Sequence, residues 1–149
     1  MRLLGQREHS RAELERKLAG HETEPGQLAR ALDELQARGL ISDERTIESV
    51  IHRRAGKLGA ARLRQELAAK GLGGEAVTLA LEALRATERA RAREVWQRKF
   101  GARPNDAREH ARQVRFMVGR GFAPELVRSV LRGDDDESPR GALPNGTSC

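Results

Sequence analysis

The chain has 149 residues, of which 34 % are charged and 38 % hydrophobic, with three Phe, one Trp and no Tyr. This length suits one domain or a short repeat array, and a composition poor in aromatic residues but rich in helix formers argues against sheet architecture. We expect neither a membrane-spanning helix nor a secretory leader, because no stretch of about 18 apolar residues occurs. The single cysteine, Cys149, excludes an intrachain disulfide, and we expect a cytoplasmic protein.

Charge is distributed unevenly along the chain. Residues 50–99 hold 12 basic and 5 acidic residues and residues 100–133 hold 7 and 3, whereas residues 1–49 hold 8 and 10. The basic part produces a positive field that attracts polyanions or an acidic protein surface. An alternative is a compositional bias, since Arg outnumbers Lys by 24 to 4, with many of these charges simply solvating helices.

Apolar residues recur three and four positions apart through nearly the whole sequence. This period predicts amphipathic helices and no strands. In chain order, the apolar stripes contain Leu14 and Leu18, then Leu28, Leu32 and Leu35, then Leu63 and Leu67, then Val77, Leu81 and Leu84, then Val114 and Met117, and finally Val127, Val130 and Leu131.

Capping residues mark the ends of these helices. Ser10 followed by Glu13 predicts a capping box, and Ser42 or Asp43 is a candidate N-cap of the next long segment. Prolines suited to a first helical turn and glycines suited to a helix end are Pro25, Pro124, Gly39, Gly71 and Gly121. Opposite charges four positions apart predict the pairs Glu13–Lys17, Glu34–Arg38, Glu66–Lys70 and Glu94–Arg98.

The apolar stripes align with one another, without gaps, at a period of 49 to 50 residues. The equivalent positions are Leu18, Leu67 and Met117; Leu28, Val77 and Val127; and Leu32, Leu81 and Leu131. A period of this length accommodates three short helices. We therefore predict an all-α fold, a tandem array of three three-helix repeats forming an elongated, curved solenoid. The predicted boundaries are 1–41, 42–86 and 87–133 for the repeats and 134–149 for a flexible acidic tail.

No motif in the sequence indicates covalent chemistry. His9, His21, His52 and His110 lie in four different helical contexts without cysteine or carboxylate partners at metal-ligand spacing. Phosphate-binding glycine loops and a nucleophile elbow are also missing. Trp96 and Phe100, four positions apart, are more typical of a core pair than of a base-stacking platform. We predict a binding protein without cofactor or metal, not an enzyme.

Basic residues of the second and third repeats form the candidate binding surface. Arg85, Arg89 and Arg93 recur every four positions and share a helical face if one helix runs from 85 to 99. Guanidinium groups on a concave solenoid surface suit phosphate oxygens or acidic side chains. The candidates are Arg62, Arg64, Lys70, Arg85, Arg89, Arg93, Arg98, Lys99, Arg108, Arg112, Arg115 and Arg120.

Four motifs, in order, resemble a known family. They are the segment from Glu8 to Leu18, ARGLISDE at 37–44, LGAARLRQELAAKGL at 58–72 and RQVRFMVGRGFAPELVRSVL at 112–131. Together they resemble the bacterial RecX family of regulators of the RecA recombinase. The resemblance covers about residues 3 to 132, nearly all of the predicted folded part.

The resemblance implies a protein that binds the RecA nucleoprotein filament and inhibits its ATPase, strand-exchange and co-protease activities. It would thereby modulate DNA repair and the SOS response. Two other readings stay open: a single-stranded DNA-binding protein that competes for DNA by charge, and an adaptor solenoid for another acidic partner. We expect a monomer with no membrane partner and no small-molecule substrate.

Overall fold

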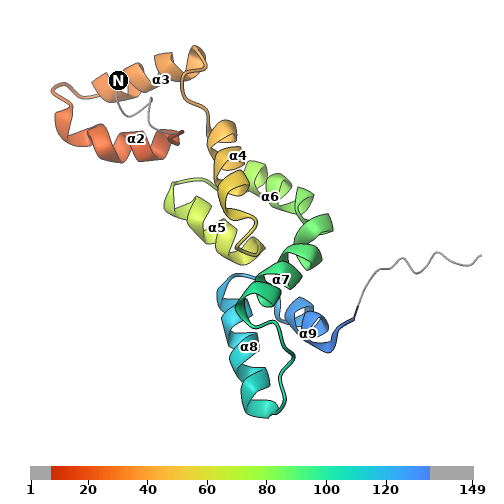
Figure 1. Cartoon of the computed structure of the whole chain (residues 1–149). Coiled ribbons are helices and arrows are strands. Elements are labelled where there is room, and N and C mark those ends of the chain that lie inside the picture. The colour runs from red at the N-terminus through yellow and green to blue at the C-terminus, as the bar shows by residue number, and fades with distance from the viewer. Residues whose placement is uncertain (1–7, 135–149) are drawn as a thin grey trace, which may run out of the picture.

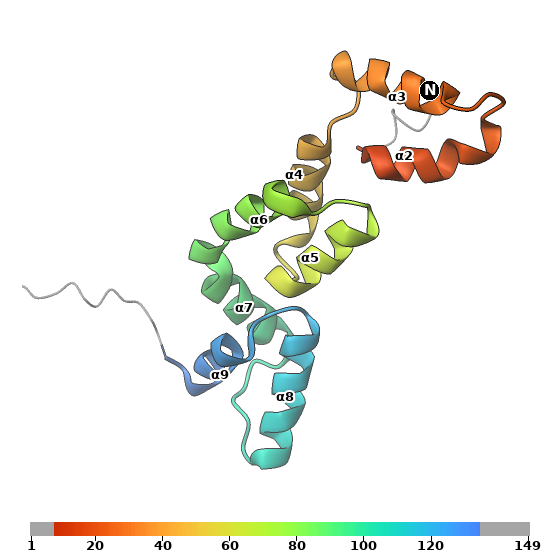
Figure 2. The same cartoon turned by 180° about the vertical axis from the view of Figure 1, so that it is seen from behind.

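The computed structural model describes residues 8–134, and every regular element in that part of the chain is a helix. The expected all-α architecture is confirmed. The elements are α2 (Arg11–Leu18), η1 (Ala19–His21), α3 (Gln27–Ala37), α4 (Asp43–Arg54), α5 (Ala60–Ala69), α6 (Gly74–Ala83), α7 (Arg85–Lys99), α8 (Ala107–Gly119) and α9 (Pro124–Arg132). They form an elongated, curved molecule with α2 and α3 at one end and α8 at the other (Figure 1; Figure 2). Within residues 8–134, no helix has the length and apolar character needed to cross a bilayer.

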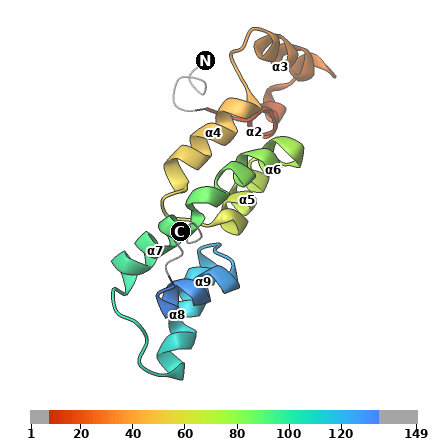
Figure 3. The ribbon, with the colours of Figure 1, turned by 90° about the vertical axis from the view of Figure 1, so that its right-hand side faces the viewer.

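The hydrophobic core is divided into three separate clusters, one for each unit of the array. Unit 1 contains α2 and α3, unit 2 contains α4 to α6, and unit 3 contains α7 to α9, arranged one after another (Figure 3). The cluster of unit 1 is Leu14, Leu32 and Ile41. That of unit 2 is Ile47, Val50, Leu58, Leu63, Leu67, Leu72, Val77 and Leu81. That of unit 3 is Ala92, Val95, Trp96, Met117, Phe122, Val127, Val130 and Leu131.

The repeated apolar positions are buried as the sequence predicts. Leu67 and Met117 are inaccessible to solvent, and so are the equivalent Val77 and Val127. In unit 1 only Leu32 of the three equivalent positions is buried, and Leu18 and Leu28 are half-buried. The stripes therefore mark the core of each unit, while the repeat boundaries stay predictions.

Most predicted caps are present. The Ser10 hydroxyl accepts a hydrogen bond from the backbone N–H of Glu13 (3.1 Å), and the Glu13 carboxylate accepts one from the N–H of Ser10 (2.9 Å). Ser42 caps α4, and Pro124 is the first residue of α9. Pro25 instead lies in the turn before α3, whose N-cap is Gly26.

Two of the four predicted intrahelical ion pairs are wrong. Glu34–Arg38 (2.8 Å) and Glu94–Arg98 (3.7 Å) form as expected. Glu13 instead pairs with Lys70 of unit 2 at 3.1 Å. Glu66 pairs with Arg54 of α4 at 2.9 Å. Both glutamates face a neighbouring helix, where a partner distant in sequence is closer than the residue four positions away.

Units 2 and 3 are joined at the N-terminal end of α5. This helix has no side-chain cap of its own. The backbone N–H groups of Gly59 and Ala61 instead donate to the carbonyls of Arg120 (2.8 Å) and Gly121 (3.2 Å), just past the end of α8. Because helix N-termini leave their first N–H groups without partners inside the helix, unit 3 supplies the cap that α5 lacks.

The same joint recurs between units 1 and 2. The Ser10 hydroxyl donates to the carbonyl of Lys70, and the Arg16 guanidinium donates to the carbonyl of Ala69 (3.1 Å) at the end of α5. Ser10 and Gly59 are equivalent positions in the repeat, as are Lys70 and Arg120. The end of α5 therefore contacts the start of α2, and in the same way the end of α8 contacts the start of α5. We call this contact the capping joint.

Arg91 of α7 makes a second connection between units 2 and 3. Its Nη1 donates to the carbonyls of Ala55 and Leu58, both at 2.8 Å, just after α4, and its Nη2 donates to that of Leu84 at 3.4 Å. Burial lowers the pKa of Arg91 from its usual value. This side chain satisfies backbone acceptors near the α4 C-terminus and belongs to the scaffold.

Candidate anion-binding groove between the second and third units

The twelve cations predicted from the sequence are distributed over several places. Arg62 and Lys70 lie at the capping joints, where Arg62 donates to the carbonyl of Gly119 (3.1 Å). Arg64 and Arg85 line a groove beside α5 and α6, and Arg89 and Arg93 contact Asp134. The other six lie around α8 and the end of α7, and they are Arg98, Lys99, Arg108, Arg112, Arg115 and Arg120.

One groove between units 2 and 3 gathers several of these cations. It has a volume of about 420 Å³ and is formed by the C-terminal end of α4, the last turns of α7 and the end of α8. We call it the basic groove. Its lining is Arg54, Lys57, Val95, Arg98, Lys99, Phe116 and Arg120, with no carboxylate among them.

Phe116 organises the cations of the basic groove. The Nζ atom of Lys99 and the guanidinium carbon of Arg120 each lie 5.0 Å from the centre of its ring. Phe100 packs edge-on against the same ring, with 5.5 Å between ring centres. Cations at such distances are attracted by the ring quadrupole, so Phe116 holds two positive charges in place without neutralising them.

The remaining charges of the basic groove differ in how far they are neutralised. Arg54 forms two hydrogen bonds with Glu66, at 3.0 and 2.9 Å, and Arg98 donates to the carbonyl of Gly56 at 3.3 Å. Within residues 8–134, no carboxylate pairs with Lys57, Lys99 or Arg120. These three unpaired charges can therefore receive phosphate oxygens or carboxylates from a partner.

Sequence reasoning missed Arg54 and Lys57. They stand at and after the end of α4, where basic residues also favour the negative end of the helix dipole. Nothing in the local pattern shows that this end faces α7. A signal was available in Arg53-Arg54 and Lys57, three cations within five residues, directly before the segment that joins unit 3.

The Glu66–Arg54 pair supports the wall of the basic groove and is sensitive to acid. Hydrogen bonds from Arg54 hold the pKa of Glu66 below its ordinary 4.5, against the opposing effect of burial. A carboxylate with a lowered pKa in the folded state stabilises the protein above its unfolded pKa. This contribution is lost as pH falls through the folded value.

We therefore expect Glu66→Gln to lower the free energy of unfolding by about 1 kcal/mol near neutral pH. The difference from the parent chain shrinks as pH falls below 4.5 and through the lowered folded-state pKa of Glu66, because the carboxyl then becomes protonated in both states. Urea denaturation from about pH 7 to about pH 3 measures this difference. Glu75→Gln, at an exposed position of α6, is the control. A difference that stayed constant across this range would contradict the assignment.

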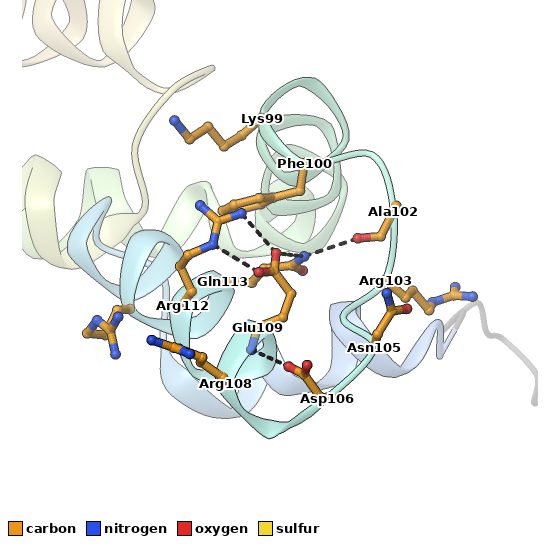
Figure 4. A pocket seen from close by; sticks show the side chains of 11 residues that line it. Lys99, Phe100, Ala102, Arg103, Asn105, Asp106, Arg108, Glu109, Arg112 and Gln113 are labelled. Carbon is orange, nitrogen blue, oxygen red and sulfur yellow. Dashed lines mark hydrogen bonds and ion pairs between the residues drawn. The ribbon is translucent and has the colours of Figure 1, made fainter.

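A second pocket, at the N-terminal end of α8, uses its charges internally. Arg112 lies 5.1 Å from the centre of the Phe100 ring and forms two hydrogen bonds with Glu109, at 3.0 and 2.9 Å (Figure 4). Gln113 donates to Glu109 and to the carbonyl of Ala102, both at 3.1 Å, and accepts from the Trp96 indole at 2.8 Å. Arg112 is therefore part of a structural network of unit 3.

Ligands for a metal ion do not cluster in the described part of the chain. No group of three or more His, Cys, Asp or Glu side chains there could hold such an ion. The basic groove therefore offers positively charged side chains, which suit an anionic ligand.

Comparison with known proteins agrees with the three-unit architecture. Models of the first, second and third three-helix domains of RecX match residues 1–35, 42–81 and 87–131. The chain is 55 % identical over 137 residues to the regulatory protein RecX of Leptothrix cholodnii, covering 92 % of this chain and 87 % of that protein. It is 48 % identical over 132 residues to that of Ralstonia nicotianae, with coverages of 89 % and 83 %.

A solved structure has the same fold. The crystal structure of RecX from Lactobacillus salivarius superposes with a TM-score of 0.74 over 89 % of both chains, at 16 % sequence identity. The fold therefore persists where few residues are shared, as expected when apolar spacing, rather than particular side chains, specifies it.

Proposed function

This chain belongs to the RecX family of regulatory proteins, and on that premise we propose that it binds the RecA nucleoprotein filament and inhibits it. The activities inhibited are ATP hydrolysis, strand exchange and co-protease activity, so that the protein modulates DNA repair and the SOS response. We further propose that it acts in the cytoplasm as a monomer.

The basic groove supports this proposal. A nucleoprotein filament presents DNA phosphates and protein carboxylates, and Lys57, Lys99 and Arg120 offer three charges without carboxylate partners among the described residues. The groove lies at the joint between units 2 and 3. A filament ligand in the groove would contact both units at once, because α4 belongs to unit 2 and α7 and α8 belong to unit 3.

Reversing two of these charges tests the proposal. We expect the double variant Lys57→Glu, Lys99→Glu to need a roughly tenfold higher concentration for half-maximal inhibition of DNA-dependent ATP hydrolysis. The matched control is Arg30→Glu with Arg53→Glu, which changes the net charge equally at exposed positions outside the groove. Equal inhibition by both double variants, each shown to be folded by thermal denaturation, would overturn the role of the groove.

Direct competition for single-stranded DNA is the second candidate function. Phe116 between cations favours it, since aromatic residues in basic grooves are typical of single-strand binding sites. Binding to free DNA through about five phosphates falls steeply with salt. ATP hydrolysis by preformed filaments, measured at a salt concentration that abolishes binding to free DNA, separates the two. Inhibition there supports action on the filament, and its loss supports competition for DNA.

A further inference from the structure

The chain leaves α9 through a cluster of arginines. The backbone carbonyl of Asp134 accepts hydrogen bonds from Arg89 (3.2 Å) and Arg93 (3.4 Å) of α7. The Asp134 carboxylate pairs with Arg132 of α9 at 3.0 Å. Three guanidinium groups from two helices therefore converge on one residue.

The helix end fixes the direction in which the chain leaves. Gly133 has a left-handed conformation (φ +81°), and the backbone N–H of Asp134 donates to the carbonyl of Ser129 at 3.2 Å. These are the features of a Schellman motif. A Cβ atom at position 133 would overlap the guanidinium of Arg103, whose side chain reaches toward the end of α9 (Figure 4).

Arg89 and Arg132 also border a groove of about 600 Å³ between α7 and α9. Its lining is Arg89, Glu125, Leu126, Arg128, Ser129 and Arg132, with Glu125 as its one carboxylate. We call this groove, with Arg93, the α7–α9 face. It shares no lining residue with the basic groove. In the sequence, Asp134 is followed directly by Asp135, Asp136 and Glu137.

We propose that the α7–α9 face is a binding site for an acidic protein segment, and that the chain's own acidic run, residues 134–137, is its intramolecular ligand. Asp134 contacts Arg89, Arg93 and Arg132, and three further acidic residues follow it directly in the sequence. Guanidinium groups match carboxylates in a two-pronged geometry that suits such a segment. An acidic partner must displace the run before it can occupy the face. This proposal does not depend on the proposed function.

Tethering gives the acidic run an advantage over any partner in solution. A segment joined directly to its site acts at an effective concentration in the millimolar range. The tethered run therefore lowers the apparent affinity of a micromolar partner for the face, and the reduction grows with the run's own affinity for the face. Only a partner that binds the face more strongly than this competition allows can displace the run, so weakly acidic segments are excluded.

Binding of a labelled octaglutamate peptide to the full chain tests this proposal. We expect Asp135→Asn with Asp136→Asn and Glu137→Gln to bind the peptide roughly tenfold more tightly than the parent chain at low salt. The control, Glu24→Gln with Glu48→Gln and Glu75→Gln, changes the net charge equally at exposed positions of units 1 and 2. It should bind the peptide within about twofold of the parent chain. Equal tightening in both triple variants would mean a general charge effect and would overturn the proposal. The proposal would also be overturned if the acidic-run variant bound a single-stranded oligonucleotide more tightly but not the octaglutamate peptide.

Energy transfer reports the intramolecular contact without any partner. Trp96 is the only tryptophan and Cys149 the only cysteine. Ser138→Cys in a Cys149→Ser background therefore accepts a single acceptor dye just after the acidic run. We expect transfer from Trp96 to fall as salt rises to about 0.5 M, and with Arg128→Glu combined with Arg132→Glu. Transfer that responds to neither would show that the run does not occupy the face.

Discussion

Replacing Gly121 by alanine is expected to lower the free energy of unfolding of units 2 and 3 by about 3 kcal/mol. Gly121 has φ +99°, which a residue with a side chain adopts only with strain. Its Cβ would also lie 2.5 Å from both the Cβ and the backbone nitrogen of Arg62, and 2.9 Å from the carbonyl oxygen of Gly59. Backbone atoms cannot rotate out of the way, so the capping joint must open.

Gly119→Ala, two positions earlier, is the matched control. A Cβ there meets no atom within 4 Å, and residue 119 is the last helical residue of α8. Because alanine is the better helix former, we expect this change to be neutral or to stabilise the protein by up to about 1 kcal/mol. Urea denaturation followed by Trp96 fluorescence measures both variants. Similar midpoints for the two would show that the capping joint does not form in solution.

Replacing Arg91 by methionine is expected to cost about 2–4 kcal/mol. Methionine keeps much of the apolar volume of the side chain but leaves the carbonyls of Ala55, Leu58 and Leu84 without this donor. Hydrogen bonds from a charged donor to part-buried acceptors are worth more than exposed ion pairs. The loss should exceed that from removing any single surface ion pair.

Arg85→Met supplies the comparison within the same helix. Arg85 is 73 % exposed and, within residues 8–134, pairs with Glu82 alone, at 3.3 Å, so its loss should change stability by less than about 0.5 kcal/mol. Arg91→Lys keeps the charge but not the fork that reaches several carbonyls, and we expect an intermediate value. Denaturant midpoints and slopes give the three energies. An Arg91→Met variant as stable as Arg85→Met would contradict the scaffold role of Arg91.

Apolar spacing made the helices and their core positions predictable, because burial repeats with the helical period. Leu67 and Met117 show this, since both were predicted as equivalent and both are fully buried. Contacts between units were not predictable in the same way. Glu13 has Lys17 at an ideal spacing, yet its carboxylate is buried against Lys70. Only the packing of α5 against α2 decides between those two partners.

The candidate site was predictable as a region but not as a surface. Sequence counting identified Arg98, Lys99 and Arg120, which line the basic groove, and missed Arg54 and Lys57, which complete it. Arg112 was selected by the same count but is bound to Glu109 within unit 3. A charge count records how many cations a segment carries. Which of them have partners depends on neighbouring helices that the count does not include.

The capping joint makes the array directional, with a consequence for synthesis of the chain. Helix α2 begins with its own capping box at Ser10, but α5 obtains its cap from the carbonyls of Arg120 and Gly121. A ribosome that has released unit 2 has therefore made a helix whose first N–H groups still bind water. We therefore expect unit 2 to reach its final structure only after the turn following α8 has left the ribosome. Helix α8 has its own N-cap, Asp106, and so needs no cap from a following unit.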